Sequence, residues 1–270
     1  MKGFVSLLFL CFSISSFAQN VEITKARAEA GYAHEQFELG TLYSRGGNGI
    51  TINYDEAFRW FSASAAQCNP KAQQALGVCY EYGYGVEKNI AKANELYAES
   101  FPVLRLMAEE GDAQAQFGLG LSYDEGKGVQ QDFAEAMRWY RKAAGQGDAG
   151  GQCNLGVCYE YGNGVRQDFT EAVKWYTKAA NQGHAVAQYN LGVSYANGHG
   201  VEQSIDDAVK WFSKAAETGL ADAQHNLGWC YEKGEGVPQN IQEAITWYTR
   251  AAKQNNEKAL EALSKLGIIL

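Results

Sequence analysis

The chain has 270 residues, of which 46% are hydrophobic, and its 31 acidic and 23 basic residues give a formal net charge of −8. Such an acidic chain lacks the basic footprint that nucleic-acid binding needs and is not attracted to anionic membranes. The length alone would suit two domains, so the pattern along the chain has to decide the domain organisation.

Residues 1–18 have the composition of a signal peptide. Lys2 supplies the positive end and residues 4–12 form the apolar core. Residues 16–18 (Ser-Phe-Ala) form a small-x-small cleavage site before Gln19. We therefore expect export to the periplasm or the extracellular space, with no membrane insertion after cleavage.

Two other fates of this segment stay open. A lipoprotein would carry its lipid on Cys11, although Leu10 stands where that motif needs a small residue. The second alternative is an uncleaved anchor. Residues 19–29 follow as a short lead-in segment.

From residue 30 onward one motif returns at a nearly fixed spacing. The glycine of a Leu-Gly pair recurs at intervals of 37, 43, 36, 36 and 36 residues, and these repeat glycines number repeats one to six: Gly40, Gly77, Gly120, Gly156, Gly192 and Gly228. This period is typical of stacked supersecondary units. The sequence predicts an all-α fold, a continuous right-handed α-solenoid of about six repeats over residues 30–255.

Each repeat combines two helical patterns with a glycine turn. In repeat four, the spacing of apolar residues predicts a first helix over 149–161. Gly162 follows where a helix needs a left-handed residue. The second helix begins at Asp168, and Glu171 completes a capping-box spacing, in which each side chain accepts one free N–H of the helix start.

The repeat glycines lie in the middle of the first helices, where each costs about 1 kcal/mol relative to alanine. We expect close approach to offset this cost, with the Trp-Tyr pair of a neighbouring helix lying over the missing side chain. Gly192→Leu should therefore destabilise the fold by overpacking.

The pattern Ala-x-x-Asn-Leu-Gly-x-x-Tyr-x-x-Gly-x-Gly-Val, followed by Ala-x-x-Trp-Tyr-x-Lys-Ala-Ala, resembles the Sel1-like repeat. That family forms αα-hairpin solenoids related to tetratricopeptide arrays. The resemblance extends from residue 30 to the C-terminus. It implies a surface that binds other proteins rather than an enzyme, and no cofactor.

Two segments depart from the pattern. Seven residues are added in repeat two around Pro102, which should kink or break the second helix. This insertion is either a tolerated bulge or a contact with a partner. Residues 256–270 match only a first helix, with Ser264 in place of the glycine, and we predict a polar capping helix there.

We expect the five cysteines after the signal peptide to be free and mostly buried thiols: Cys68, Cys79, Cys153, Cys158 and Cys230. Three of them take the same place in repeats two, four and six, about 20 Å apart, whereas a disulfide needs Cα atoms within about 7 Å. Cys153 and Cys158 are five residues apart on one helix and point to different sides. The cysteines, histidines and acids form no zinc or catalytic spacing, so we predict no enzyme activity and no metal site.

One stripe of the first helices varies between repeats while the packed positions hardly change. It comprises the positions three before, one after and five after the repeat glycine, and an asparagine often stands two before it. On the concave face of the array these positions would bind a protein or peptide partner. The candidate residues are Phe117, Asn154, Tyr189, Asn190, His225, Asn226 and Trp229.

For some of these residues a packing role is the alternative. Phe117 and Tyr189 could belong to the core between repeats, and the asparagines could bond to the preceding turn or to the next repeat. The predicted function is an exported, non-enzymatic scaffold or adaptor. A secreted hydrolase of the β-lactamase or penicillin-binding type, which the family resemblance brings in, and a secreted effector that binds a host protein remain as alternatives.

Overall fold

The structure, a computed structural model, describes residues 21–46 and 49–268. Within these ranges the chain forms α-helices joined by turns, without a β-strand, so the predicted all-α repeat fold is confirmed. The predicted signal peptide, residues 1–18, lies outside the described residues.

The chain forms two compact units that divide between Leu106 and Met107. Unit 1 contains a helix over residues 21–29 and the helices α2 (Ala33–Arg45), α3 (Tyr54–Ala65), α4 (Pro70–Tyr82) and most of α5 (Ile90–Glu109). Unit 2 contains α6 (Ala113–Glu125), α7 (Phe133–Gly145), α8 (Ala149–Tyr161), α9 (Phe169–Asn181), α10 (Ala185–Asn197), α11 (Ile205–Glu217), α12 (Ala221–Lys233), α13 (Ile241–Ala252) and α14 (Glu257–Lys265).

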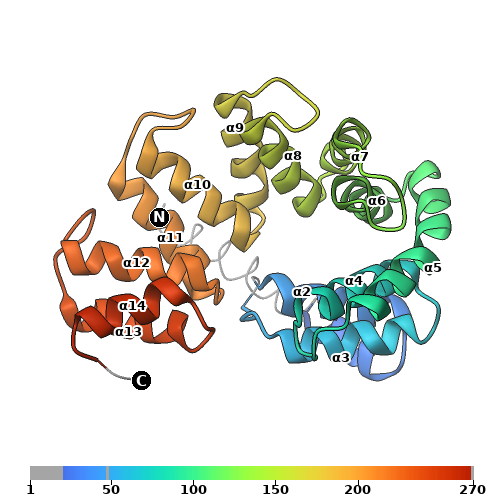
Figure 1. Cartoon of the computed structure of the whole chain (residues 1–270), viewed down its shortest axis with the longest axis horizontal. Helices are drawn as coiled ribbons and strands as arrows, with labels where there is room; N and C mark the ends of the chain where they lie inside the picture. The colour runs from blue at the N-terminus through green and yellow to red at the C-terminus, as the bar shows by residue number, and fades with distance from the viewer. Residues whose placement is uncertain (1–20, 47–48, 269–270) are drawn as a thin grey trace, which may run out of the picture. The chain divides into compact units, whose positions relative to one another are not determined.

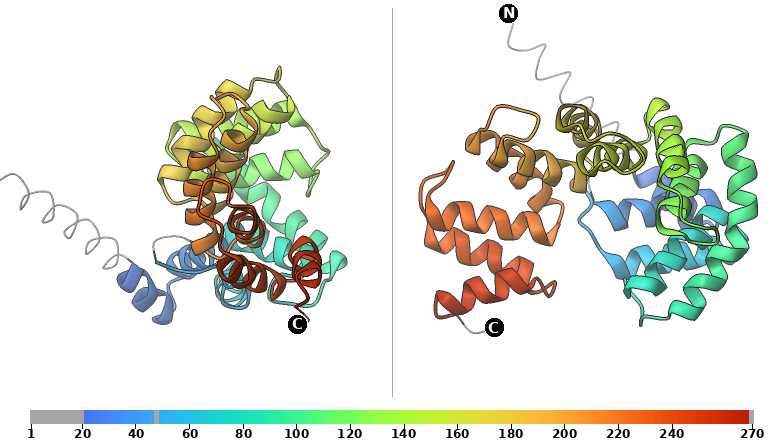
Figure 2. Two further views of the ribbon diagram at one scale, coloured as in Figure 1. Left: turned by 90° about the vertical axis from the view of Figure 1, so that its left-hand side faces the viewer. Right: turned by 45° about the horizontal axis from the view of Figure 1, so that its top comes forward.

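The even-numbered helices α2 to α12 are the first helices of the six repeats, and each following odd-numbered helix is the second. Within unit 2 every helix packs against the helices before and after it in sequence (Figures 1 and 2). In repeats four to six, each first helix therefore contacts the second helix of its own repeat and that of the preceding repeat.

The close approach predicted at the repeat glycines is present. A Cβ atom at Gly156 would lie 2.6 Å from Cε1 of Tyr176, and one at Gly192 would lie 2.7 Å from the Phe212 ring. Only the second member of the Trp-Tyr pair covers the glycine. In repeats three to five the tryptophan packs under a lysine three residues later, as Trp175 does under Lys178 with 3.8 Å from Nζ to the ring centre.

The predicted capping box is only half right. The Asp168 side chain accepts from the Glu171 N–H at 3.0 Å, as expected. However, the Asp168 N–H donates to the carbonyl of Tyr159 at 2.8 Å, while the Glu171 carboxylate pairs with Lys174. The glycine turn brings the end of the first helix back onto the start of the second, so a backbone acceptor reaches the free N–H before Glu171 can.

The lead-in segment is part of the packed array. In repeats three to six, a buried glutamine donates to an alanine carbonyl eight residues earlier, at the end of the preceding second helix, as Gln152 does to Ala144 at 3.3 Å. Gln36 makes the same bond to Ala28 at 3.2 Å. Residues 21–29 thus take the place of a second helix in front of repeat one.

Pro102 does not break its helix. It lies inside α5, which runs for 20 residues as one helix. Both Pro102 and Ala98, whose carbonyl would have accepted the missing N–H, have exposed side chains. That side of the helix faces solvent, where water can hydrate the carbonyl and the ring meets no neighbouring helix.

The five cysteines of the described residues are free, with Cys68 exposed and the other four buried. Cys153 packs in a cluster with Tyr176, and Cys158 in a different cluster with Tyr140, so they point to different sides of α8 as predicted. At the C-terminal end, α14 buries Ala259 and Leu263 against α13 and leaves its charged side chains exposed.

Candidate functional site

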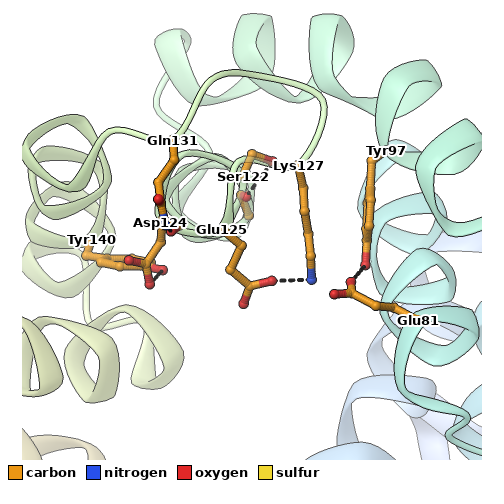
Figure 3. A network of polar contacts seen from close by, with 9 residues as sticks. Glu81, Tyr97, Ser122, Asp124, Glu125, Lys127, Gln131 and Tyr140 are labelled. Atoms are coloured by element: carbon orange, nitrogen blue, oxygen red, sulfur yellow. Dashed lines mark hydrogen bonds and ion pairs between the residues drawn. The ribbon is translucent and has the colours of Figure 1, made fainter. Parts of the chain in front are cut away.

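A tyrosine–acid pair closes the space beside the repeat glycine in four of the six repeats. The tyrosine that covers the glycine donates its hydroxyl to an acid four residues after that glycine: Tyr97 to Glu81 at 2.7 Å, Tyr140 to Asp124 at 3.1 Å, Tyr176 to Glu160 at 2.5 Å and Tyr248 to Glu232 at 2.8 Å. Figure 3 shows the first two pairs, each within its own unit. The pair fills the space between the end of the first helix and the second helix.

Burial holds three of these four tyrosines in their neutral form. It raises the pKa of Tyr176, Tyr140 and Tyr248 well above 10, and the neighbouring carboxylate raises each further. Burial also raises the pKa of the Asp124 carboxyl, which the Tyr140 hydroxyl partly offsets. A neutral hydroxyl donating to a carboxylate is therefore the state expected at neutral pH.

Repeats one and five lack this pair. Phe61 and Phe212 replace the tyrosine, and Ser44 and Ala196 replace the acid. In repeat five, the missing tyrosine hydroxyl and the missing carboxylate leave space between the helices. A cavity of about 370 Å³ lies there, between α10, α11 and α12, in the size range of ligand-binding pockets.

The cavity has apolar walls and a polar rim. Val193 and Ala196 of α10, Phe212 of α11 and Trp229 of α12 contribute apolar surface. Asn197, Asn226 and Glu235 contribute polar groups. Cys230 also lines it, and burial raises the pKa of this thiol to about 11, so the thiol remains uncharged.

Trp229 is the exposed wall of the cavity. It is 39% exposed, and it stands one residue after the repeat glycine, where the other repeats carry smaller residues. An apolar pocket beside an exposed tryptophan can hold a hydrophobic group of a ligand.

The structure places the predicted site residues in three settings. Asn226 and Trp229 line the cavity together. Tyr189 and His225 are half-buried and lie with ring centres 5.9 Å from Phe212 and 5.6 Å from Tyr248, respectively.

The remaining candidates, Phe117, Asn154 and Asn190, do not line the cavity. Phe117 is half-buried with its ring centre 6.1 Å from that of Tyr140. Asn154 makes a hydrogen bond that lowers the pKa of the same tyrosine, so it contacts the preceding repeat. Asn190 is half-buried at the matching position.

Nine of the residues that line the cavity were not among the candidates, including four that shape it: Ala196, Ile205, Phe212 and Glu235. The signal for two of them is present in the sequence. Wherever the second helix carries tyrosine at this position, the first helix carries an acid, and the two phenylalanines accompany serine or alanine. A comparison of these two columns between repeats would have found the pocket.

The fold and this site define a helical-repeat protein in which the packed residues are nearly constant and the surface residues differ between repeats. The sequence model of the Sel1 repeat matches six stretches: residues 36–67, 70–100, 113–148, 149–184, 185–220 and 221–256. The chain therefore belongs to the Sel1 repeat family.

Two solved structures are similar over most of the chain. A Sel1 repeat protein from Oxalobacter formigenes is 38% identical, with a TM-score of 0.57, and the match covers 78% of this chain and 81% of that one. The protein c5321, a protective antigen of uropathogenic Escherichia coli strains with an SLR fold, is 36% identical, with a TM-score of 0.56. That match covers 91% of this chain and 51% of c5321, so the chain spans about half of that relative.

Curated relatives match shorter stretches. The DAP3-binding cell death enhancer 1 of Rattus norvegicus is 33% identical over 80 residues, which is 30% of this chain and 15% of that protein. In the described part of the chain, no helix is long and apolar enough to span a membrane. Nor do three or more His, Cys, Asp and Glu side chains gather as metal ligands within residues 21–46 and 49–268.

Proposed function

We propose that the chain is an exported, non-catalytic scaffold that binds a protein or peptide partner through the first-helix face of unit 2. The observation that carries the proposal is Trp229, a large apolar side chain that is 39% exposed beside an apolar cavity. Tryptophan is one of the residues that contribute most binding energy in protein interfaces.

The pattern of variation supports the same face. Residues that pack repeat on repeat recur almost unchanged, including the repeat glycine, its leucine and the buried glutamine. The positions that differ lie on the face with Trp229, as expected for a frame that carries a specific surface. The net charge of −8 favours a neutral or basic partner, chiefly through the rate of association.

The chemistry of the thiols argues against a cysteine hydrolase. Burial raises the pKa of Cys79 and Cys158 to about 12, so neither supplies a thiolate nucleophile at neutral pH. A binding role needs no such group.

Affinity capture from the native cell envelope tests the binding proposal. The bait proteins are the wild type, Trp229→Ala and, as a matched control, Trp211→Ala, which removes a half-buried tryptophan of α11 that packs under Lys214. We expect a partner that the wild type and the Trp211 variant retain and the Trp229 variant loses. Equal capture by all three, or no partner at all, would contradict binding at this face.

Export is the second part of the proposal. It rests on the composition of residues 1–18 and is supported by the likeness to a protective antigen. N-terminal sequencing of the protein from an envelope or culture fraction should find Gln19 as the first residue. A cytoplasmic chain that starts at Met1 would refute it.

A further inference from the structure

The cavity between repeats five and six lies where three positions differ from their counterparts in other repeats. The first is the tyrosine–acid pair. In repeat four, Tyr176 and Glu160 fill this position, whereas in repeat five Phe212 has no hydroxyl and Ala196 has no carboxylate. Because Phe212 still covers Gly192, the helix packing stays intact while the outer space is left open.

The second is a ring at the middle of the Gly-x-Gly turn, which repeats two and five carry as Tyr84 and His199. This residue lies over the first residue of the preceding second helix. Tyr84 stacks on Tyr54 with 4.5 Å between ring centres, and His199 lies 4.8 Å from Phe169. Between repeats five and six these places hold Glu235 and Ile205, which have no rings, and both line the cavity.

The third difference is at the position one residue after the repeat glycine. Repeats four and five carry Val157 and Val193 there, whereas repeat six carries Trp229. The tryptophan extends the apolar wall toward solvent. The result is a pocket with a deep apolar end and an open mouth on the first-helix face.

The charged side chains that line the pocket determine which residue of a ligand can lie next to its apolar group. Of the described residues that line the cavity, Glu235 alone carries a charge at neutral pH. Exposed Asn197 offers an uncharged amide at the same rim. A ligand therefore meets one negative charge and no positive one.

We propose that this pocket binds an extended polypeptide segment that inserts one aliphatic or aromatic side chain against Phe212 and Trp229 and places a basic residue next to Glu235. This inference rests on the proposed function, since it names the chemistry of the partner. The open mouth favours a chain over a free small molecule, because a chain continues along the face and covers the exposed Trp229.

The repeats themselves supply a variant that should fill the pocket without unfolding the protein. Ala196→Glu with Phe212→Tyr recreates the pair that Glu160 and Tyr176 form one repeat earlier. The matched control is Ser44→Glu with Phe61→Tyr, which adds the same two groups to repeat one. Both should melt at or above the wild-type temperature.

The probe is a terminally blocked octapeptide of glycine and serine that carries one leucine followed by one arginine. The readout is the NMR signal of the Trp229 indole N–H, assigned by Trp229→Phe. We expect the peptide to shift this signal in the wild type and in the repeat-one control. The filled variant should bind at least about tenfold more weakly.

Peptide variants test the two contacts separately. Leucine to serine should abolish the shift, and arginine to glutamate should weaken it. The proposal is overturned if no peptide moves the Trp229 signal at millimolar concentration, or if the filled variant binds as well as the wild type. Equal binding of N-acetyl-leucinamide alone would also overturn it, because it would indicate a small-molecule site.

The capture experiment distinguishes failure of the pocket proposal from failure of the proposed scaffold function. If the filled variant still captures the partner that Trp229→Ala loses, the scaffold function stands and the pocket is not the anchor site. If neither the wild type nor any variant captures a partner, the scaffold function itself fails.

Discussion

At the scale of single residues, the contact between the two helices of a repeat depends on the absence of a Cβ atom at the repeat glycine. The ring of Tyr176 or Phe212 occupies the space that a Cβ would take at Gly156 or Gly192. A mid-helix glycine costs about 1 kcal/mol in helix propensity, but the aromatic ring that replaces its side chain buries far more apolar surface.

Gly192→Leu is expected to lower the free energy of unfolding by roughly 2 kcal/mol or more, because its Cβ alone would lie 2.7 Å from Phe212. Gly145→Leu is the control. A Cβ at Gly145 would meet nothing within 4 Å, so this change should be neutral or slightly stabilising. Urea denaturation of both variants measures the difference, and equal stability would contradict the close-approach explanation.

The thiols should react according to their burial. Burial raises the pKa of Cys79 and Cys158 to about 12 and that of Cys230 to about 11, and Cys153 is 1% exposed. At pH 8 we expect a thiol reagent to label Cys68 fast in the folded chain without residues 1–18, and the other four only after denaturation. Fast labelling of Cys158 in the native protein would show that the fold is looser than described.

At the scale of elements, pairs of one exposed and one buried glutamine join neighbouring repeats. Gln182 donates to Gly147 O at 3.0 Å and to Gln152 Oε1 at 2.8 Å, and Gln146 and Gln254 make the equivalent pair of bonds. In repeat five, Thr218 stands in this place. Among the described residues, Gln188 Oε1 is left buried without a hydrogen-bond partner.

Thr218→Gln should therefore stabilise the protein by about 1 kcal/mol, since its amide can donate to Gln188 Oε1 and to the Gly183 carbonyl. Thr218→Glu has the same length but no N–H to donate, and it should not stabilise. Thermal and urea unfolding of the two variants decides between them. A gain with glutamate equal to that with glutamine would point to packing rather than to the hydrogen bond.

The tyrosine–acid pairs should make the protein sensitive to alkali. The folded-state pKa values of Tyr140, Tyr176 and Tyr248 lie above the value of about 10 that applies when unfolded. Above that pH, unfolding releases protons, so the free energy of unfolding falls as the pH rises. Absorbance of tyrosinate between pH 9 and 12 should show these three titrating only with unfolding, and Tyr176→Phe should reduce the pH dependence.

At the scale of the whole molecule, the helices of unit 2 pack mainly against their neighbours in sequence, so the stability of unit 2 is expected to be a sum of local terms. The six family matches leave residues 101–112 unmatched, and the boundary between the two compact units falls in this stretch, inside α5. The seven added residues lengthen one second helix, so the helix continues where the repeat spacing is interrupted.

The C-terminal end gives a test of this additivity. Leu263→Ala should cost about 2–3 kcal/mol, since Leu263 is 1% exposed in the cluster with Tyr248, whereas Leu260→Ala, at a site 42% exposed, should cost little. Hydrogen exchange should rise in α13 and α12 and leave α6 to α9 unchanged. A uniform rise through unit 2 would show cooperative rather than local stability.

The sequence by itself determined the repeat architecture, because periodic spacing, glycine turns and capping residues act within about 36 residues and recur six times. It also predicted the close approach at the repeat glycines, since a costly mid-helix glycine requires a neighbour. Asn226 and Trp229 were selected as residues of one binding face, which stays a prediction, and the spacing did not show that they line one cavity.

Only the tertiary structure decided where the cavity lies, that the Asp168 N–H bonds to Tyr159, and that α5 runs through Pro102. These outcomes depend on volumes, acceptors and solvent that several helices bring to one point. Ala196, Phe212 and Glu235 are unremarkable in their own helices, and they form a pocket because none of them fills the space that their counterparts fill in other repeats. A period along the chain specifies which helices meet, but the side chains that meet determine whether space remains between them.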